Sequence, residues 1–146
     1  MPQTAATLRP ATTSDAPAVA AVAAELGYPD AGEGLARRIL DLARRDDHAL
    51  MVAELDGRVV AWIHTCVIRS PLWDAIAEIH ALVVTEAERS RGVGAALVAW
   101  AEEWARGQGC CRIRVRSRDT RLRAHRFYER LAYDVTKSQK VFDKRL

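Results

Sequence analysis

Long hydrophobic runs are missing from the sequence: no stretch approaches the roughly 18 consecutive apolar residues that a membrane-spanning helix needs. Cysteine is scarce, with Cys66 and the adjacent pair Cys110 and Cys111 as the only three, and none has the spacing of a metal site. An odd number of cysteines without a framework spacing argues against disulfide cross-links and for a reducing compartment. We therefore expect a cytoplasmic protein that is not anchored in a membrane and has no metal site.

Repeats, low-complexity segments and linkers are also missing. The chain has 146 residues, of which 49% are hydrophobic and 28% charged. This balance is typical of globular proteins, and the length suits one domain with its own core. The sequence thus predicts a single domain over residues 1–146.

Positive charge is unevenly distributed, although the net charge is only +3. The segment 112–130 holds eight arginines and two acidic residues. Such a block suits an anionic ligand, a nucleic acid or plain solvent. Because 19 of the 22 basic residues in this chain are arginine, the use of arginine here says little by itself. The block also lacks the interleaved aromatic residues of a single-stranded nucleic-acid platform, which argues against that partner.

Hydrophobic periodicity predicts alternating strands and helices. Asp56-Gly57 is a strong hairpin signal between two of the strands, and a loop with Pro71 and Trp73 should precede the next one. The expected strands cover about 7–11, 50–55, 59–68, 76–85 and 113–115, with one or two more in the tail 133–146, and the expected helices cover about 14–26, 32–45, 93–106 and 122–131. This order predicts an α/β (α+β) fold with a mixed sheet of six to seven strands and helices on both faces.

The segment 89–94, Arg-Ser-Arg-Gly-Val-Gly, lies between an apolar strand and an amphipathic helix. A helix N-terminus presents unpaired N–H groups and a positive dipole end, and glycines let the backbone approach a phosphate closely. There is no Gly-Lys-Ser/Thr and no third glycine of a dinucleotide fingerprint, so two common nucleotide sites are excluded. The segment fits a pyrophosphate site, or simply a tight strand-to-helix turn.

Two stretches resolve that choice by resemblance. Arg89-x-x-Gly92-x-Gly94, preceded by Glu-Ile-His-Ala-Leu-Val-Val at 78–84, resembles the acyl-CoA-binding core of the GNAT family of N-acetyltransferases. Residues 124–133, Ala-His-Arg-Phe-Tyr-Glu-Arg-Leu-Ala-Tyr, resemble the last helix of that family. The order of elements matches the GNAT fold along nearly the whole chain.

The resemblance implies that acetyl-CoA is the co-substrate and that the fourth and fifth strands splay apart to admit its pantetheine arm. The arm would pair with the main chain of the fourth strand, as a peptide adds to a sheet edge. The implied cofactor-binding residues are Leu82, Val83, Val84, Arg89, Ser90, Arg91, Gly92, Val93, Gly94, Arg118 and Tyr128. Arg118 stands where many relatives have asparagine. Ala132 replaces a glycine of the family's ending, which disfavours a left-handed helix cap.

Glu78 and His80 are candidates for proton transfer. Strict alternation in a strand puts Glu78, His80, Leu82 and Val84 on one face, so two ionisable side chains share an otherwise apolar surface. An acceptor ammonium must lose a proton before it attacks a thioester, and a carboxylate or an imidazole can take it. A salt-bridged glutamate and a hydrogen-bonded histidine are the structural alternative. We expect Glu78 to contribute more than His80, and the pair also resembles some aminoglycoside-acetylating members of the family.

Tyr128 lies on the apolar stripe of the last expected helix, so periodicity alone makes it a core residue. The resemblance makes it the tyrosine whose hydroxyl protonates the departing CoA thiolate. None of the three cysteines is paired with a histidine at a recognisable spacing, so we expect direct transfer in a ternary complex rather than a covalent acyl-enzyme.

Three functions remain open at this point: an N-acetyltransferase acting on a primary amine, which we favour, an acyl-CoA sensor with the same fold, and a basic nucleic-acid-binding module. The resemblance is also compatible with a homodimer. The first two helices and the Trp73 segment should shape the acceptor pocket, but nothing in them names the acceptor.

Overall fold

Five strands form one mixed sheet in the computed structural model, which describes residues 5–146. They are β1 (Thr7–Pro10), β2 (His48–Leu55), β3 (Arg58–Ser70), β4 (Trp73–Val84) and β5 (Ile113–Val115), in that order across the sheet. β1 to β4 are antiparallel neighbours, and β5 runs parallel to β4. Hairpins join β2 to β3 and β3 to β4, whereas a helix is needed before β5 because parallel neighbours require a crossover.

The two hairpins differ in how well the sequence predicts them. Asp56 and Gly57 have positive φ angles of 50° and 74°, as the turn of a two-residue hairpin requires. The predicted loop between β3 and β4 is wrong, because Ser70 already pairs with Trp73 and only residues 71–72 connect the strands. Trp73 therefore begins a strand, with 44% of its surface exposed.

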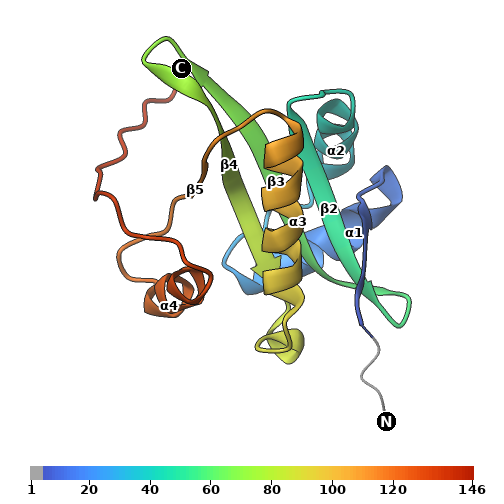
Figure 1. Cartoon of the computed structure of the whole chain (residues 1–146). Helices are drawn as coiled ribbons and strands as arrows, with labels where there is room; N and C mark the ends of the chain where they lie inside the picture. Colours follow the sequence, from blue (N-terminus) through green and yellow to red (C-terminus); the bar gives the residue numbers. More distant parts are fainter. Residues whose placement is uncertain (1–4) are drawn as a thin grey trace. The chain divides into compact units, whose positions relative to one another are not determined.

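Three helices cover the two faces of the sheet (Figure 1). α1 (Ala16–Glu25) and α2 (Leu35–Ala43) lie on one face, and α3 (Val93–Gly107) lies on the other. Short 3₁₀ turns, η1 (Thr13–Asp15) and η2 (Glu86–Glu88), precede α1 and follow β4. α3 buries one stripe of apolar residues, including Leu97 and Val98, against β3 and β4. The predicted helices on both faces are confirmed, since α1 and α2 pack on one face of the sheet and α3 packs on the other.

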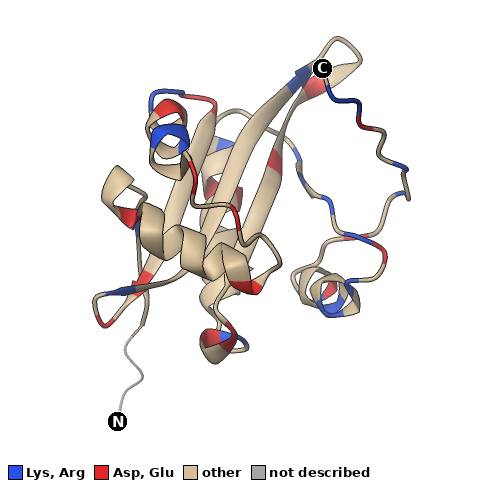
Figure 2. Ribbon diagram, turned by 180° about the vertical axis from the view of Figure 1, so that it is seen from behind, with Lys and Arg blue, Asp and Glu red and all other residues tan. Residues whose placement is uncertain are grey.

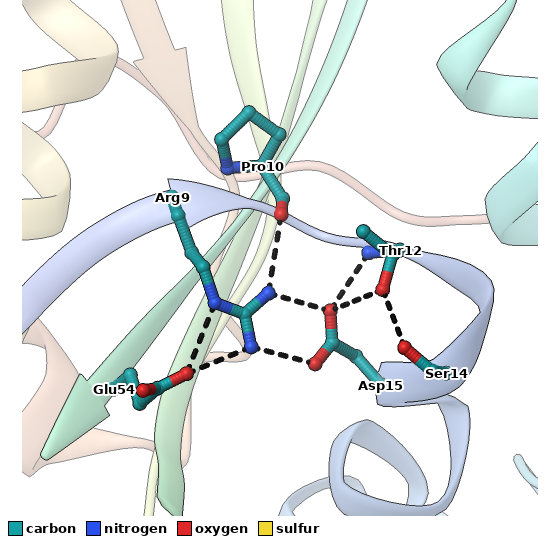
Figure 3. Close-up of polar contacts among 6 residues, drawn as sticks. All are labelled: Arg9, Pro10, Thr12, Ser14, Asp15 and Glu54. Atoms are coloured by element: carbon teal, nitrogen blue, oxygen red, sulfur yellow. Dashed lines mark hydrogen bonds and ion pairs between the residues drawn. The ribbon is translucent and has the colours of Figure 1, made fainter. Parts of the chain in front are cut away.

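A network of charged side chains fixes the start of α1 (Figure 3). The guanidinium of Arg9 donates two hydrogen bonds of 2.8 Å to Asp15 and two more, of 2.9 and 3.0 Å, to Glu54. Asp15 also accepts a hydrogen bond of 2.7 Å from the main-chain N–H of Thr12, which makes it part of a capping box. The hydrogen bonds from Arg9 hold the pKa of Asp15 down at about 2. Arg9 and Asp15 together thus join β1 to β2, through Glu54, and to the start of the first helix.

The chain divides into two compact units, Met1–Val115 and Arg116–Leu146, and the second contains one helix, α4 (Leu122–Arg130). Figure 2 shows Arg and Lys residues along α4 and the segments on either side of it. α4 ends in a complete left-handed cap. The N–H of Ala132 donates to the carbonyl of Glu129 and the N–H of Tyr133 donates to that of Tyr128, both at 3.0 Å. Ala132 adopts a φ of 67°, so the left-handed cap forms although glycine is absent.

The tail after α4 corrects the expected number of strands. Residues 133–146 form neither helix nor strand, so the sheet has five strands and not six or seven. Val135, Val141 and Phe142 are exposed by 79%, 79% and 89%. An alternating pattern becomes a strand only where a neighbouring strand supplies hydrogen-bond partners, and the tail pairs with none in the described chain. No helix of residues 5–146 is both long and apolar enough to cross a membrane.

Candidate active site

An extra residue in β4 shapes the centre of the site. Ala81 pairs with His64 of β3, but the next residue of β3, Thr65, pairs with Ile79, so His80 is left without a partner. This is the geometry of a β-bulge, which bends a strand and re-aims its side chains. The bulge lies in the stretch where the sequence places the candidates for proton transfer.

The bulge changes which residues share a face. Directly opposed residues of antiparallel strands point to the same side, and Glu78 is opposite Cys66 whereas Val83 is opposite Trp62. Glu78, His80, Ala81 and Val83 therefore lie on the α1 side, and Ile79, Leu82 and Val84 lie on the α3 side. The expectation that Glu78 and His80 share a face holds. The expectation that Leu82 and Val84 join them is wrong, because one added residue reverses a period of two.

The same region of β4 has an open edge. Within residues 5–146, β5 pairs with Ala77, Glu78 and Ile79 of β4, and no strand pairs with His80–Val84 on that side. The polar main-chain groups of an unpaired edge offer a template for another extended chain. Residues 82–84 thus lie where an extended ligand can add to the sheet.

The turn 89–94 leads from this edge into α3. Ser90 and Gly92 both have positive φ angles, 65° and 83°, and Gly92 is the residue that caps α3. A side chain added at Gly92 would meet no atom within 4 Å, so the space in front of the helix is open. No side chain of the described residues caps this helix, which leaves its first N–H groups and its positive dipole end to face that space. The turn can therefore hold an anion, as the sequence predicts.

Two contacts fix the approach to this turn, and one of them was not expected from the sequence. The Nε of Arg89 donates a hydrogen bond of 3.2 Å to the carbonyl of Val84. Glu25, the last residue of α1, accepts hydrogen bonds from the hydroxyl of Thr85 at 2.8 Å and from the main-chain N–H of Glu86 at 2.9 Å. These bonds lower the pKa of Glu25. Only the tertiary structure reveals this role, because Glu25 is 60 residues away in sequence.

Glu78 is a buried carboxylate with an arginine on one side and a histidine on the other. Glu78 is 6% exposed. Its Oε2 accepts a hydrogen bond of 2.8 Å from Nε of Arg114 and lies 2.7 Å from Nη2 of the same guanidinium. The other oxygen, Oε1, lies 3.8 Å from Nε2 of His80, whose side chain is 45% exposed. The ion pair keeps a charge in a place where an unpaired one would be costly. A buried acidic group thus contacts an imidazole that solvent can reach.

Three of the four histidines form one stack across β2, β3 and β4. The ring of His64 lies between those of His48 and His80, with centroid distances of 5.2 Å on each side and interplanar angles of 22° and 27°. Nδ1 of His48 and Nε2 of His64 are 2.9 Å apart and share a hydrogen bond. Burial, helped by the two neighbouring rings, lowers the pKa of His64 to about 4. Burial also lowers the pKa of His48, against the opposite influence of Asp47.

The remaining predicted residues, Arg118 and Tyr128, belong to the second unit. Burial raises the pKa of Tyr128 to about 12, so its phenol keeps its proton at neutral pH. The ring packs edge-on against Phe127, with centroids 5.0 Å apart, and tilted against Tyr133, at 5.6 Å. The main-chain carbonyl of Arg118 accepts from the N–H of Arg121 at 3.0 Å and so helps to begin α4.

Other ionisable groups offer little chemistry. Burial raises the pKa of Cys66 to about 11 and raises that of Cys110 as well, so both thiols are protonated and poor nucleophiles. The described residues contain no group of three or more His, Cys, Asp or Glu side chains that could hold a metal ion. A cavity of about 530 Å³ opens beside α1, lined by residues including Arg9, Glu25 and Glu88. None of the predicted site residues lines it.

Comparisons with known proteins agree with this geometry. Residues 17–133 match the model of the Acetyltransferase (GNAT) family. The aminoalkylphosphonate N-acetyltransferase of Salmonella typhimurium is 34% identical over 131 residues, which cover 86% of this chain and 83% of that protein.

Solved structures share the fold at low sequence identity. Aminoglycoside N-acetyltransferase AAC(6')-Iy in complex with CoA matches with a TM-score of 0.86 and 15% identity, over 100% of this chain and 99% of that one. A putative acetyltransferase from Agrobacterium tumefaciens matches with a TM-score of 0.83 and 22% identity, over 94% and 99% of the two chains. The family match covers both the turn 89–94 and the Glu78–His80 pair. The chain therefore belongs to the GNAT family, and it is an acetyl-CoA-dependent N-acetyltransferase.

Proposed function

We propose that the acceptor of this N-acetyltransferase is the primary amine of a small molecule. The observation that carries the proposal is the 34% identity to an enzyme named for aminoalkylphosphonates, a class of small amines, over 86% of this chain. The solved structures that share the fold include enzymes named for aminoglycosides, which are also small amines. The exposed imidazole of His80 lies beside the open edge of β4, where such an amine can approach.

The co-substrate would lie along the same edge. Leu82, Val83 and Val84 would pair with the pantetheine arm, and the N–H groups at the start of α3 would hold the pyrophosphate together with Arg89, Ser90 and Arg91. Glycine is the residue type that adopts a φ of 83° at little cost, and position 92 has this angle. Because Gly92 has no side chain, the approach to the helix stays open. Arg118 would add a positive charge for the cofactor.

Deprotonation of the acceptor is the task of the Glu78–His80 pair. The ammonium must give one proton to a base before its nitrogen attacks the thioester carbonyl. His80 is the exposed member, whereas Glu78 is buried and already paired with Arg114. We propose that His80 takes the proton, directly or through water, and that Glu78 stabilises the resulting imidazolium. This order is the reverse of the one expected from the sequence, and it follows from the burial of the carboxylate.

Tyr128 completes the reaction in this proposal. The C–N bond forms, the C–S bond breaks, and the departing thiolate of CoA takes the phenolic proton. The second proton that the nitrogen loses as the amide forms restores the phenol. The raised pKa of Tyr128 supports the role, because the group is protonated when the thiolate leaves. The proton taken by His80 then returns to solvent. Cys66 and Cys110 are buried and protonated, so they are poor nucleophiles for an acyl-enzyme. This supports direct attack of the amine on the thioester.

Two predictions about the setting of the enzyme remain. A homodimer is supported by the exposed apolar residues of the tail, Val135, Val141 and Phe142, which a second copy can cover. A cytoplasmic location is supported by the three free cysteines. Measurement of the mass in solution would test the first of these.

Release of free CoA thiol, measured against a panel of amines, tests the acceptor. Aminoalkylphosphonates and aminoglycosides represent small amines, and peptides with a free N-terminus or a lysine represent proteins. We expect turnover of small amines and little turnover of peptides. Faster turnover of peptides would overturn the proposal, and stabilisation by acetyl-CoA without turnover of any amine would indicate an acyl-CoA sensor.

The cofactor site has its own test. Acetyl-CoA at about 100 times its Kd should stabilise the protein by about 2.7 kcal/mol. In Gly92→Asp a carboxylate faces the pyrophosphate, and we expect this stabilisation to disappear. Gly57→Asp is the matched control, since Gly57 also has a positive φ, 74°, and free space around it, but lies in the β2–β3 hairpin. If both variants lose the effect equally, backbone strain is the cause and the pyrophosphate assignment is wrong.

A further inference from the structure

His64 has no place in the proposed chemistry, yet it contacts the residue that has one. It lies on β3 with one face against the ring of His80 and the other against the ring of His48. Its Nε2 is held at 2.9 Å by Nδ1 of His48. The middle ring of the stack is therefore held by both of its neighbours.

The bulge in β4 explains why His80 needs such a support. His80 is the unpaired residue of the bulge, so it has no residue directly opposite it to restrict its side chain. Its side chain is 45% exposed, and its Nε2 is 3.8 Å from Glu78, too far for a hydrogen bond of normal length. The ring of His80 stacks on that of His64, with centroids 5.2 Å apart and an interplanar angle of 27°.

We propose that His64, held by His48, is a positioning residue that fixes the imidazole of His80 for deprotonation of the acceptor amine. The inference rests on the role given to His80 above and adds two residues that do not touch the acceptor. A catalytic group must be held to within a fraction of an ångström of its productive position by packing and hydrogen bonds behind it. The stack supplies that support from β3, which is the strand next to β4.

A neutral support suits this task better than a charged one. His80 becomes positive when it accepts a proton, and a cation beside it would oppose that step. Burial keeps His64 uncharged near neutral pH, since its pKa is about 4. A neutral aromatic ring also attracts a cation placed over its face. The charged groups nearby are paired: Arg45 with Asp47 next to His48, and Arg114 with Glu78 next to His80.

Two replacements of His64 distinguish the contribution of its ring to kcat from the contribution of its hydrogen bond. His64→Ala removes the surface on which His80 lies, and we expect kcat to fall about 10-fold with the KM for acetyl-CoA unchanged. His64→Phe keeps an aromatic ring without the hydrogen bond, and we expect kcat within about 3-fold of the wild type. Equal losses in the two variants would overturn the role of stacking. Melting temperatures with and without acetyl-CoA show that each variant is folded and binds the co-substrate.

A double-mutant cycle with His80→Ala tests whether His64 acts through His80. We expect His64→Ala to lower kcat in the wild type but to have almost no effect in His80→Ala. Two losses that multiply in the double variant would show that His64 acts independently, and the proposal would be wrong.

NMR of the imidazole C–H groups tests positioning without reference to activity. We expect the resonances of His80 to shift in His64→Ala, because the ring current of His64 is lost, and to change less in His64→Phe. Unchanged resonances would overturn the proposal. If the resonances shift while kcat stays unchanged in both His64→Ala and His80→Ala, the stack positions His80 but His80 is not the base, so the role given to it above fails.

Discussion

Asp15 and Glu78 are the buried carboxylates of the described residues, and each is paired with an arginine, yet their surroundings differ. All the hydrogen bonds shown for Asp15 come from Arg9 and Thr12, which hold strands and a helix together. Arg114 pairs with Oε2 of Glu78, and Oε1 of Glu78 lies 3.8 Å from the exposed ring of His80. A buried ion pair alone therefore does not mark an active site, whereas one beside an accessible proton carrier indicates chemistry.

The largest expected effect is on kcat, which should fall when Glu78 is neutralised but not when Asp15 is. Glu78→Gln keeps the size of the side chain and removes its charge, so the imidazolium of His80 loses its stabilising partner. We expect kcat to fall about 10²-fold, the range for a disabled acid–base group. Steady-state kinetics over pH 6–9 would measure it, with Asp15→Asn as the control that retains kcat. An unchanged rate and pH profile in Glu78→Gln would reduce Glu78 to a structural role like that of Asp15.

Tyr128 extends the comparison to the proton donor. Tyr128→Phe keeps the ring that packs against Phe127 and Tyr133 and removes only the hydroxyl. We expect kcat to fall about 10-fold or more, with little change in acetyl-CoA affinity or melting temperature. Turnover and melting should be measured on the same preparation. Intact activity would make Tyr128 a core residue, and a loss of stability in proportion to activity would indicate a buried hydrogen bond.

For the free energy of unfolding, we expect the substitution at Asp15 to matter more than the one at Glu78. Asp15→Asn weakens the bonds to Arg9 and the capping box, and we expect a loss of about 2 kcal/mol in the free energy of unfolding. Chemical denaturation measures this loss, and thiol release should show normal turnover of the folded fraction. A large fall in kcat without a change in stability would break the distinction between the two carboxylates.

The same residue gives a pH dependence with a definite sign. The pKa of Asp15 is about 2 in the folded protein, below the ordinary value of 3.8. A lowered pKa means that the stabilisation is fully present above about pH 4 and is lost as the pH falls towards 2. We therefore expect the difference in unfolding free energy between the wild type and Asp15→Asn to shrink between pH 5 and pH 2. A difference that stays constant over this range would show that Asp15 does not titrate there.

The smallest expected effect concerns Ala132, which lies in neither environment. Its φ of 67° costs an alanine about 1 kcal/mol relative to the right-handed region, and glycine avoids that cost. We expect Ala132→Gly to stabilise the protein by up to about 1 kcal/mol without change in kcat. Thermal melting would detect the change, and a decrease in stability would mean that the alanine side chain makes a compensating contact.

Much of the fold follows from local sequence. The periodicity predicts all four helices and the five strands that form, because apolar spacing reports which face of an element is buried. Asp56-Gly57 predicts its hairpin because few residue pairs accept two positive φ angles in succession. The strands predicted in the tail failed for the same physical reason that the others succeeded: alternation describes a surface that can be buried, but a strand also needs a neighbour.

The site was predicted unevenly. The sequence alone determined the turn 89–94, because glycines before an amphipathic helix make a local structure that needs no distant contact. Strand alternation made Glu78 and His80 candidates for proton transfer. The tertiary structure decided the rest. Arg114 meets Glu78 only through the parallel register of β4 and β5, and Glu25 reaches Thr85 across 60 residues. His48 stacks with His64, and His64 with His80, because three strands pair in one register and one carries a bulge. Spacing along a chain fixes neighbours within a few residues, whereas pairing between strands depends on the whole sheet.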